Sequence, residues 1–508
     1  MSNKSIEKIV IVGGGSSGWM TAAALSCHLP SSTKIELVES DEIATVGVGE
    51  ATIPAIRTFN KALGIDEPEF MRVTNATFKL GIRFENWGKI GDAYNHAFGH
   101  FGNPINGVSF HNYWHKMQHD ENTGSIHEYN LPNQASESGK FSLKQYNNDA
   151  QSRYFYAFQF DAGLYARYLR TKAEKSGVVR TEGKIVTVSQ DNESGFIQSV
   201  TLESGETIEG DLFIDCSGFR ALLIEKTLKV GYQDWSHYLP VNSAWAVSSA
   251  YPSEDAAIPP YTRARALTAG WQWRIPLQNR TGDGNVFSNG YISEDEAHKQ
   301  LLDNLEGKPL SDPRLIKFTT GKREKLWHKN CVSIGLSSGF LEPLESTSLY
   351  LIQATILQLI KSFPSKDFDV STENEFNERM QYNYKEARDF LILHYKATER
   401  EDTEFWKYCK NMEIPQELKH RMDLFKERGY VSYNKTDLFS EHSWLAVYYG
   451  QGIIPNKYDP RVDNVSKQEI ARFLASVKDE VRESVNSMST HNEMLAGYCA
   501  GDLISNNK

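Results

Sequence analysis

The sequence predicts an α/β protein in which one parallel sheet is assembled from separate segments and interleaved with a second domain of mixed sheet and C-terminal helices. Three observations predict it. Short apolar runs end in glycine-containing turns at three distant places, helix formers follow the first turn, and the pattern turns helical from Ser371 onward. A chain of 508 residues with 40% hydrophobic residues can fill the large core that such a fold needs.

The first of these junctions opens the chain. Residues 8–12 form an apolar run that predicts a strand, residues 13–18 predict a turn, and residues 19–25 predict a helix. A second β-like run over residues 34–38 follows. Strand, helix and strand together make a βαβ unit.

The turn of this unit carries a dinucleotide-binding fingerprint. Gly13, Gly15 and Gly18 form GxGxxG, which permits a tight turn and a close approach of the backbone to a pyrophosphate. Glu39 lies 21 residues after Gly18, where a carboxylate can accept hydrogen bonds from a ribose 2'-hydroxyl. We therefore predict that an adenine dinucleotide binds Gly13, Gly15, Ser16, Ser17, Gly18 and Glu39.

This fingerprint does not separate NAD from FAD, because both cofactors use it. The two later junctions favour FAD. The strand candidate 211–214 leads into Asp215, and the run 331–334 leads into Gly335. Both resemble later nucleotide-side turns of glutathione-reductase-type flavoproteins, so Asp215 and Gly335 are also predicted at the cofactor.

The order of these patterns predicts two interleaved parts. Residues 86–152 are rich in Asn, His, Gly and aromatics, which indicates loops around a site, and residues 235–276 indicate strands of a second sheet. Ser466 and Glu469 make a capping box before an amphipathic helix. The predicted segments are FAD-binding over 1–85, 161–225 and 321–370 (the last with a halide site), substrate-side over 86–160 and 226–320, and a helical substrate subdomain over 371–508.

Composition excludes several classes of function. A net charge of -10 argues against nucleic-acid binding, which needs clustered Lys and Arg. The five cysteines never form a CxxC pair, and no metal-spaced His/Cys cluster, HExxH or nucleophile elbow occurs, so we expect no metal site. The apolar run 9–12 is too short for targeting or membrane spanning, so a cytoplasmic protein is expected.

Further motifs make the chain resemble the tryptophan halogenase family over most of its length. They occur in the family's order at similar spacing: GGGSSGWMTAAAL (13–25), VGVGEATIP (46–54), KLGIRFENW (79–87), WQWRIP (271–276), FLEPLEST (340–347), HYKATEREDTEFW (394–406) and GQGIIP (450–455). The resemblance implies an enzyme that uses reduced FAD (FADH2), O2 and chloride or bromide to make hypohalous acid, which passes through a tunnel to an aromatic substrate. It also places Ala51 at the cofactor.

The resemblance assigns the catalytic lysine to Lys79 and the catalytic glutamate to Glu345. An ammonium can polarise hypohalous acid, and a carboxylate can stabilise the arenium intermediate or take its proton. Thr347 and Ser348 are predicted to bind the halide at the start of a helix, where backbone amides attract anions. Ser348 stands where the family has glycine, which leaves the halide preference open.

Two aromatic motifs are assigned to the tunnel and the substrate. Trp271, Trp273, Ile275 and Pro276 match the family's WxWxIP signature beside the tunnel. His96, Phe98 and Trp444 match residues that hold the flat substrate ring.

One departure changes the predicted substrate. Members that act on free tryptophan carry a Tyr-Tyr pair and an acidic residue before the C-terminal Ser-Trp, whereas residues 434–441 read NKTDLFSE here. The chain therefore looks more like the subgroup that acts on indole or other substituted arenes.

Two other functions are compatible with parts of this pattern. An FAD-dependent aromatic hydroxylase shares the fold, and a non-catalytic flavin-binding protein would be expected to lack Lys79 or Glu345, both of which are present. No second dinucleotide fingerprint occurs, so a separate NAD(P)H-dependent flavin reductase is the expected partner. A homodimer is expected from the family alone.

Overall fold

The structure, a computed structural model, describes residues 5–42, 49–144 and 154–500. Its residues divide into two units, each built from three separate stretches. The first unit comprises Met1–Asn75, Phe160–His237 and Lys317–Lys385, and the second comprises Ala76–Gln159, Tyr238–Ile316 and Glu386–Lys508. Residues 46–48 of the predicted VGVGEATIP motif lie outside the described residues.

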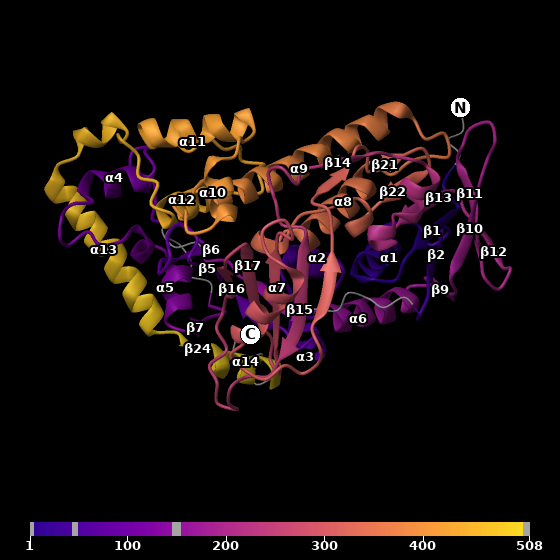
Figure 1. Ribbon diagram of the computed structural model, residues 1–508, viewed down its shortest axis with the longest axis horizontal. Coiled ribbons are helices and arrows are strands. Elements are labelled where there is room, and N and C mark those ends of the chain that lie inside the picture. Colours follow the sequence, from indigo (N-terminus) through magenta and orange to yellow (C-terminus); the bar gives the residue numbers. More distant parts are fainter. Residues whose placement is uncertain (1–4, 43–48, 145–153, 501–508) are drawn as a thin grey trace. The chain divides into compact units, whose positions relative to one another are not determined.

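The first unit is built on a six-stranded sheet in the order β21-β22-β13-β1-β2-β9 (Figure 1). Its strands are β1 (Lys8–Val12), β2 (Lys34–Glu39), β9 (Val179–Glu182), β13 (Leu212–Asp215), β21 (Trp327–His328) and β22 (Cys331–Ser333). All neighbouring pairs are parallel except β21 with β22. The predicted strands at 8–12, 34–38, 211–214 and 331–334 thus lie in one sheet, which confirms the predicted fold class.

Helix α1 (Ser16–His28) packs on β1 and β2 of this sheet, and the other helices of the first unit pack on α1 or on one another. These others are α2 (Ala55–Ala62), α3 (Glu67–Val73), α6 (Ala162–Lys175) and α8 (Ser348–Lys361). The smaller strands of this unit are β3 (Gly49–Ala51), β10 (Ile185–Gln190), β11 (Ile197–Leu202), β12 (Thr207–Glu209), β14 (Tyr232–Asp234), β20 (Gly321–Arg323) and β23 (Gly339–Phe340). Helix α1 contacts α6 and α8, and α2 also contacts α8.

The second unit contains a seven-stranded mixed sheet in the order β19-β15-β18-β17-β16-β5-β6. Its strands are β5 (Gly81–Glu85), β6 (Ala93–Ala97), β15 (Ser243–Ser249), β16 (Thr262–Ala266), β17 (Gly270–Pro276), β18 (Thr281–Phe287) and β19 (Arg314–Lys317). Strands β15, β16 and β17 come from the region 235–276 that was predicted to supply a second sheet.

Short helices and the C-terminal helices complete the second unit. They are α4 (Phe110–Met117), α5 (Leu131–Glu137), α7 (Glu294–Asp303), α10 (Glu404–Asn411), α11 (Gln416–Arg428), α12 (Glu441–Gly450), α13 (Lys467–Asn486) and α14 (His491–Ala500). The Ser466–Glu469 capping box is formed at the start of α13. None of the described helices combines the length and apolar composition that a membrane span requires.

At three places the unit borders differ from the predicted segments by ten residues or more. Residues 76–85 were predicted with the FAD-binding part but belong to the second unit, because β5 pairs with β6 and β16 of the large sheet. Residues 226–237 were predicted on the substrate side but belong to the first unit, because β14 pairs with β20.

The third difference concerns α9 (Val370–Lys396), whose residues are divided between the units after Lys385. Its first half was predicted in the substrate subdomain but packs in the first unit. There Phe376 lies edge-on to Trp327, and Tyr384 hydrogen-bonds Ser338.

Candidate active site

The three glycine-containing turns meet in the first unit. A Cβ on Gly13 would lie 2.3 Å from the carbonyl oxygen of Cys216, the residue after Asp215. A Cβ on Gly335 would lie 2.7 Å from the Cβ of Ser17. Gly13 and Gly335 also have positive φ angles of 111° and 83°, which glycine adopts without strain. The predicted convergence of the three junctions is therefore present in the tertiary structure.

Because glycine has no side chain, the backbone of this turn is open to a ligand. We call residues 13–18 the glycine cradle. A Cβ on Gly18 would lie 1.9 Å from the carbonyl oxygen of Gly13, so the turn closes directly against the start of α1. Gly15 is the N-cap of α1, and Ser16 is its first residue. Bare backbone before a helix N-terminus fits the pyrophosphate of an adenine dinucleotide.

The carboxylate of Glu39 lies over the same turn. A Cβ on Gly14 would overlap Oε2 of Glu39, at 1.4 Å. The Nε of Arg180 donates to Glu39 Oε1 at 2.5 Å, and Arg170 lies 3.7 Å from the same atom. Two arginines thus orient the carboxylate that is predicted to accept from the ribose.

Asp215 has a different local role from the one that its motif suggested. It is fully buried, and its Oδ2 accepts from the backbone N–H groups of Leu223 and Ile224 at 2.8 and 2.9 Å. Its Oδ1 accepts from the backbone N–H and the hydroxyl of Ser217. Its carboxylate therefore stabilises the second turn, and a contact of Asp215 with the cofactor stays a prediction, as does that of Ala51, which ends β3.

Glu345 and the predicted halide residues lie together in the first unit. Glu345 ends a short 3-10 helix and is 1% exposed. Ser346 then adopts a left-handed conformation with φ 57°, and Thr347 is the N-cap of α8, which begins at Ser348. The Thr347 hydroxyl is buried and, among the described residues, has no hydrogen-bond partner. A buried donor at a helix N-terminus can bind an anion.

Lys79 lies in the second unit at the end of β4 (Thr77–Lys79), which pairs with β8 (Ala157–Asp161). Lys79 is 0% exposed, and its partner across the ladder is Ala157. Its Nζ lies 5.3 Å from the centroid of the Phe98 ring, within the range of a cation–π contact. Glu345 and Lys79 belong to different units, and their joint action stays a prediction.

The predicted substrate residues belong to one aromatic cluster of the second unit. His96 on β6 and Phe98 just after it have ring centroids 6.5 Å apart. Trp444 on α12 is 1% exposed and lies edge-on to Phe390, at 5.1 Å. Phe390 stacks on Phe439 at 3.8 Å, and both lie within 6.2 Å of His96. Sequence reasoning did not assign Phe390 or Phe439 to the site, because each reads as an ordinary core aromatic.

The WxWxIP residues are all buried on β17. Trp271 and Trp273 have ring centroids 6.2 Å apart, and the Trp273 ring covers Gly284 on β18, where a Cβ would lie 2.0 Å away. The carbonyl of Pro276 accepts a hydrogen bond from the hydroxyl of Thr77, two residues before Lys79. The motif thus supports the strand that carries Lys79, while its role beside a tunnel stays a prediction.

His491 on α14 also hydrogen-bonds this strand, and it was not predicted from the sequence. Its Nε2 accepts from the backbone N–H of Phe78 at 3.2 Å, and its Nδ1 donates to the carbonyl of Ile258 at 2.7 Å. The ring must be neutral for both bonds to form together, because Nε2 accepts only when it carries no proton. Burial lowers the pKa of His491 to about 4, which keeps the ring neutral near pH 7.

We expect this histidine to make stability depend on pH. Because the folded-state pKa lies below the unfolded value, its contribution is complete above about pH 6.5 and is lost as the pH falls towards 4. Replacing His491 by Gln, which does not titrate, should reduce the loss of unfolding free energy between pH 7.5 and 5 by about 1–2 kcal/mol. Urea denaturation at both pH values measures this. Identical pH profiles of the two proteins would contradict it.

The parallel sheet of the first unit and its glycine turn before α1 are typical of dinucleotide-binding oxidoreductases. The family model described as tryptophan halogenase matches residues 8–467. The flavin-dependent halogenase Xcc4156 from Xanthomonas campestris is 45% identical with a TM-score of 0.94, covering 98% of this chain and 99% of that chain. BrvH, a flavin-dependent halogenase from Brevundimonas sp. BAL3, is 43% identical with a TM-score of 0.94, covering 97% and 99%. Tryptophan 6-halogenase SttH of Streptomyces toxytricini is 33% identical over 98% of this chain and 99% of its own.

The chain belongs to the tryptophan halogenase family. It is a flavin-dependent halogenase, an enzyme class that uses FADH2, O2 and a halide and needs a separate flavin reductase. The predicted family, enzyme class and cofactors are thereby confirmed, and the hydroxylase and non-catalytic alternatives are not favoured.

Proposed function

We propose that this enzyme halogenates a neutral, electron-rich arene of the indole type, with Lys79 and Glu345 as its catalytic residues. The observation that carries the proposal is the buried side chain of Lys79, whose Nζ lies beside the ring of Phe98. His96, next to Phe98, belongs to the aromatic cluster of the second unit. Flat aromatic walls suit a flat, electron-rich ring.

Reduced FAD, when bound in the glycine cradle, supplies hypohalous acid from O2 and halide. The Lys79 ammonium donates a hydrogen bond to the oxygen of this acid, which makes the halogen electrophilic. A ring carbon then bonds to the halogen while the oxygen–halogen bond breaks, and the departing oxygen takes a proton from Lys79 to leave as water. The Glu345 carboxylate takes the proton of the arenium carbon. Thr347 and Ser348 bind the halide.

The surroundings of Trp444 support a substrate without a charged amino-acid group. Asp437 has a fully buried side chain and is paired with Arg421, which also lies 5.1 Å from the Trp444 ring. Glu441 lies 3.8 Å from His111, and burial raises its pKa, so its charged form is disfavoured. Phe439 is stacked on Phe390. Asp437 is thus already paired with Arg421, and the charged form of Glu441 is disfavoured. Neither carboxylate is well suited to hold the amine of free tryptophan, which favours a neutral substrate.

Mass spectrometry tests this proposal directly. Indole and free tryptophan are incubated separately with the enzyme, FAD, NADH, a flavin reductase and either bromide or chloride. We expect a halogenated indole, less halogenated tryptophan, and no product from the Lys79→Ala variant. Halogenation of tryptophan in preference to indole would overturn the substrate assignment. An oxygenated product without halide would replace halogenation by hydroxylation.

Three further points belong to this proposal. The flavin is reduced by a separate, NAD(P)H-dependent reductase, because this sequence carries one dinucleotide fingerprint, which is assigned to FAD. The enzyme is cytoplasmic. It is also a homodimer, and size-exclusion chromatography with light scattering tests this oligomeric state.

A further inference from the structure

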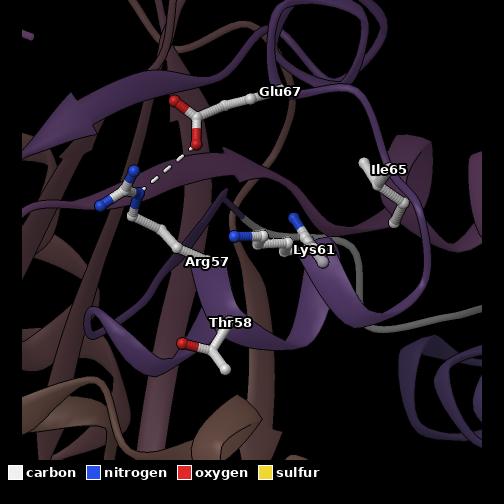
Figure 2. A pocket seen from close by; sticks show the side chains of 6 residues that line it. Arg57, Thr58, Lys61, Ile65 and Glu67 are labelled. Carbon is white, nitrogen blue, oxygen red and sulfur yellow. Dashed lines mark hydrogen bonds and ion pairs between the residues drawn. The ribbon is translucent and has the colours of Figure 1, made fainter.

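A cavity of about 350 Å³ lies at α2 and α3 of the first unit (Figure 2), and its lining includes no residue of the glycine cradle or the predicted halide site. It is lined by Arg57, Thr58, Asn60, Lys61, Ile65 and Glu67. The proposed halogenation uses none of these residues.

The charged groups of this cavity favour an anion. Arg57 and Lys61 are four residues apart on α2 and therefore share one face of the helix, as Figure 2 shows. Glu67 is the one acid among the lining residues, and its carboxylate is paired with Arg57 at 3.4 Å. The lining thus carries one more positive than negative charge, and Thr58 adds a hydroxyl donor.

A buried amide points to the same kind of ligand. Asn60 is 5% exposed, and the hydroxyl of Tyr165 donates to its Oδ1 at 2.7 Å. This bond fixes the orientation of the amide, so that Nδ2 is its donor atom on the other side. Among the described residues, this buried Nδ2 has no acceptor. A buried donor without an acceptor costs free energy, which a ligand oxygen would recover.

We infer that this cavity is a binding site for a small oxyanion, either a phosphate or a carboxylate group. Arg57 supplies a planar fork that suits both groups, Lys61 supplies a second positive charge, and Asn60 supplies the buried N–H. The cavity is larger than either group alone, so an organic part can be accommodated beside Ile65.

Isothermal titration calorimetry tests the site on enzyme saturated with FAD, in a constant chloride background. FAD occupies the glycine cradle and chloride occupies the halide site. The probe therefore cannot bind at either of these places. Inorganic phosphate and acetate are titrated in separate arms. We expect one of them to bind, and the Lys61→Gln and Arg57→Gln variants each to bind it about tenfold more weakly.

The Lys175→Gln variant is the matched control, because Lys175 is an exposed lysine of the same unit that does not line the cavity. It should bind the probe as the unaltered enzyme does. Tighter binding of phosphate would assign the ligand to phosphate compounds, and tighter binding of acetate to carboxylic acids. Binding of neither probe, or equal weakening in all three variants, would overturn the inference.

Discussion

Replacement of Lys79 by alanine is expected to lower halogenation of indole by about 10³-fold or more, because the positioned proton donor and its charge are both lost. Lys79 is fully buried at the end of β4, so solvent cannot replace its ammonium at the same place. Halogenated indole is measured by mass spectrometry, and FADH2 consumption and free hypohalous acid are followed in parallel. We expect both of these to continue in the variant.

If hypohalous acid is still formed but indole is not halogenated, Lys79 has a catalytic role. A purely structural role would impair both steps. Lys79→Met retains the bulk of the side chain without its charge and should be as inactive as Lys79→Ala. Lys89→Ala is the control, since the Lys89 side chain is 70% exposed and its ion pair with Glu399 lies at the surface. Halogenation by Lys79→Met at the rate of the unaltered enzyme would contradict the assignment.

Replacement of Gly18 by alanine is expected to weaken FAD binding about 10- to 100-fold, because the added Cβ would displace the turn at a cost of ~1–3 kcal/mol. This Cβ would lie 1.9 Å from the Gly13 carbonyl oxygen, so the backbone of the cradle has to move. Titration of the apoprotein with FAD, followed by flavin fluorescence, measures the affinity.

Gly290→Ala is the control for this substitution. A Cβ on Gly290 would meet only the Ser288 hydroxyl oxygen, at 3.9 Å. It should therefore leave FAD binding unchanged. If Gly18→Ala bound FAD with unaltered affinity, the glycine turn would not be the cradle of the cofactor.

Much of the first unit could be predicted from the sequence because its signals are local. An apolar run, a glycine turn and a helix former each show in a few consecutive residues, as at Gly13 to Gly18. The Ser466–Glu469 capping box is equally local, and it was predicted correctly. The borders between the units were less accurate, because whether β5 or β14 joins one sheet or the other depends on strands far away in the sequence.

The candidate site was only partly predictable for the same reason. Lys79, His96 and Trp444 were found through motifs, whereas Phe390 and Phe439 become site candidates only because the structure stacks them beside His96. His491 lies 413 residues from Phe78 in the chain, and nothing in its local sequence indicates their hydrogen bond.

The α/β class, the glycine turn before α1 and the halogenase family could be predicted from the sequence alone, since backbone freedom at glycines and side-chain chemistry in ordered motifs are properties of short segments. The tertiary structure was needed to show that the Asp215 carboxylate stabilises a turn, that His491 and Pro276 hydrogen-bond the strand of Lys79, and that Arg57, Asn60 and Lys61 line one cavity. The physical reason is that burial and hydrogen-bond partners are set by packing between distant segments, which no local pattern of residues encodes.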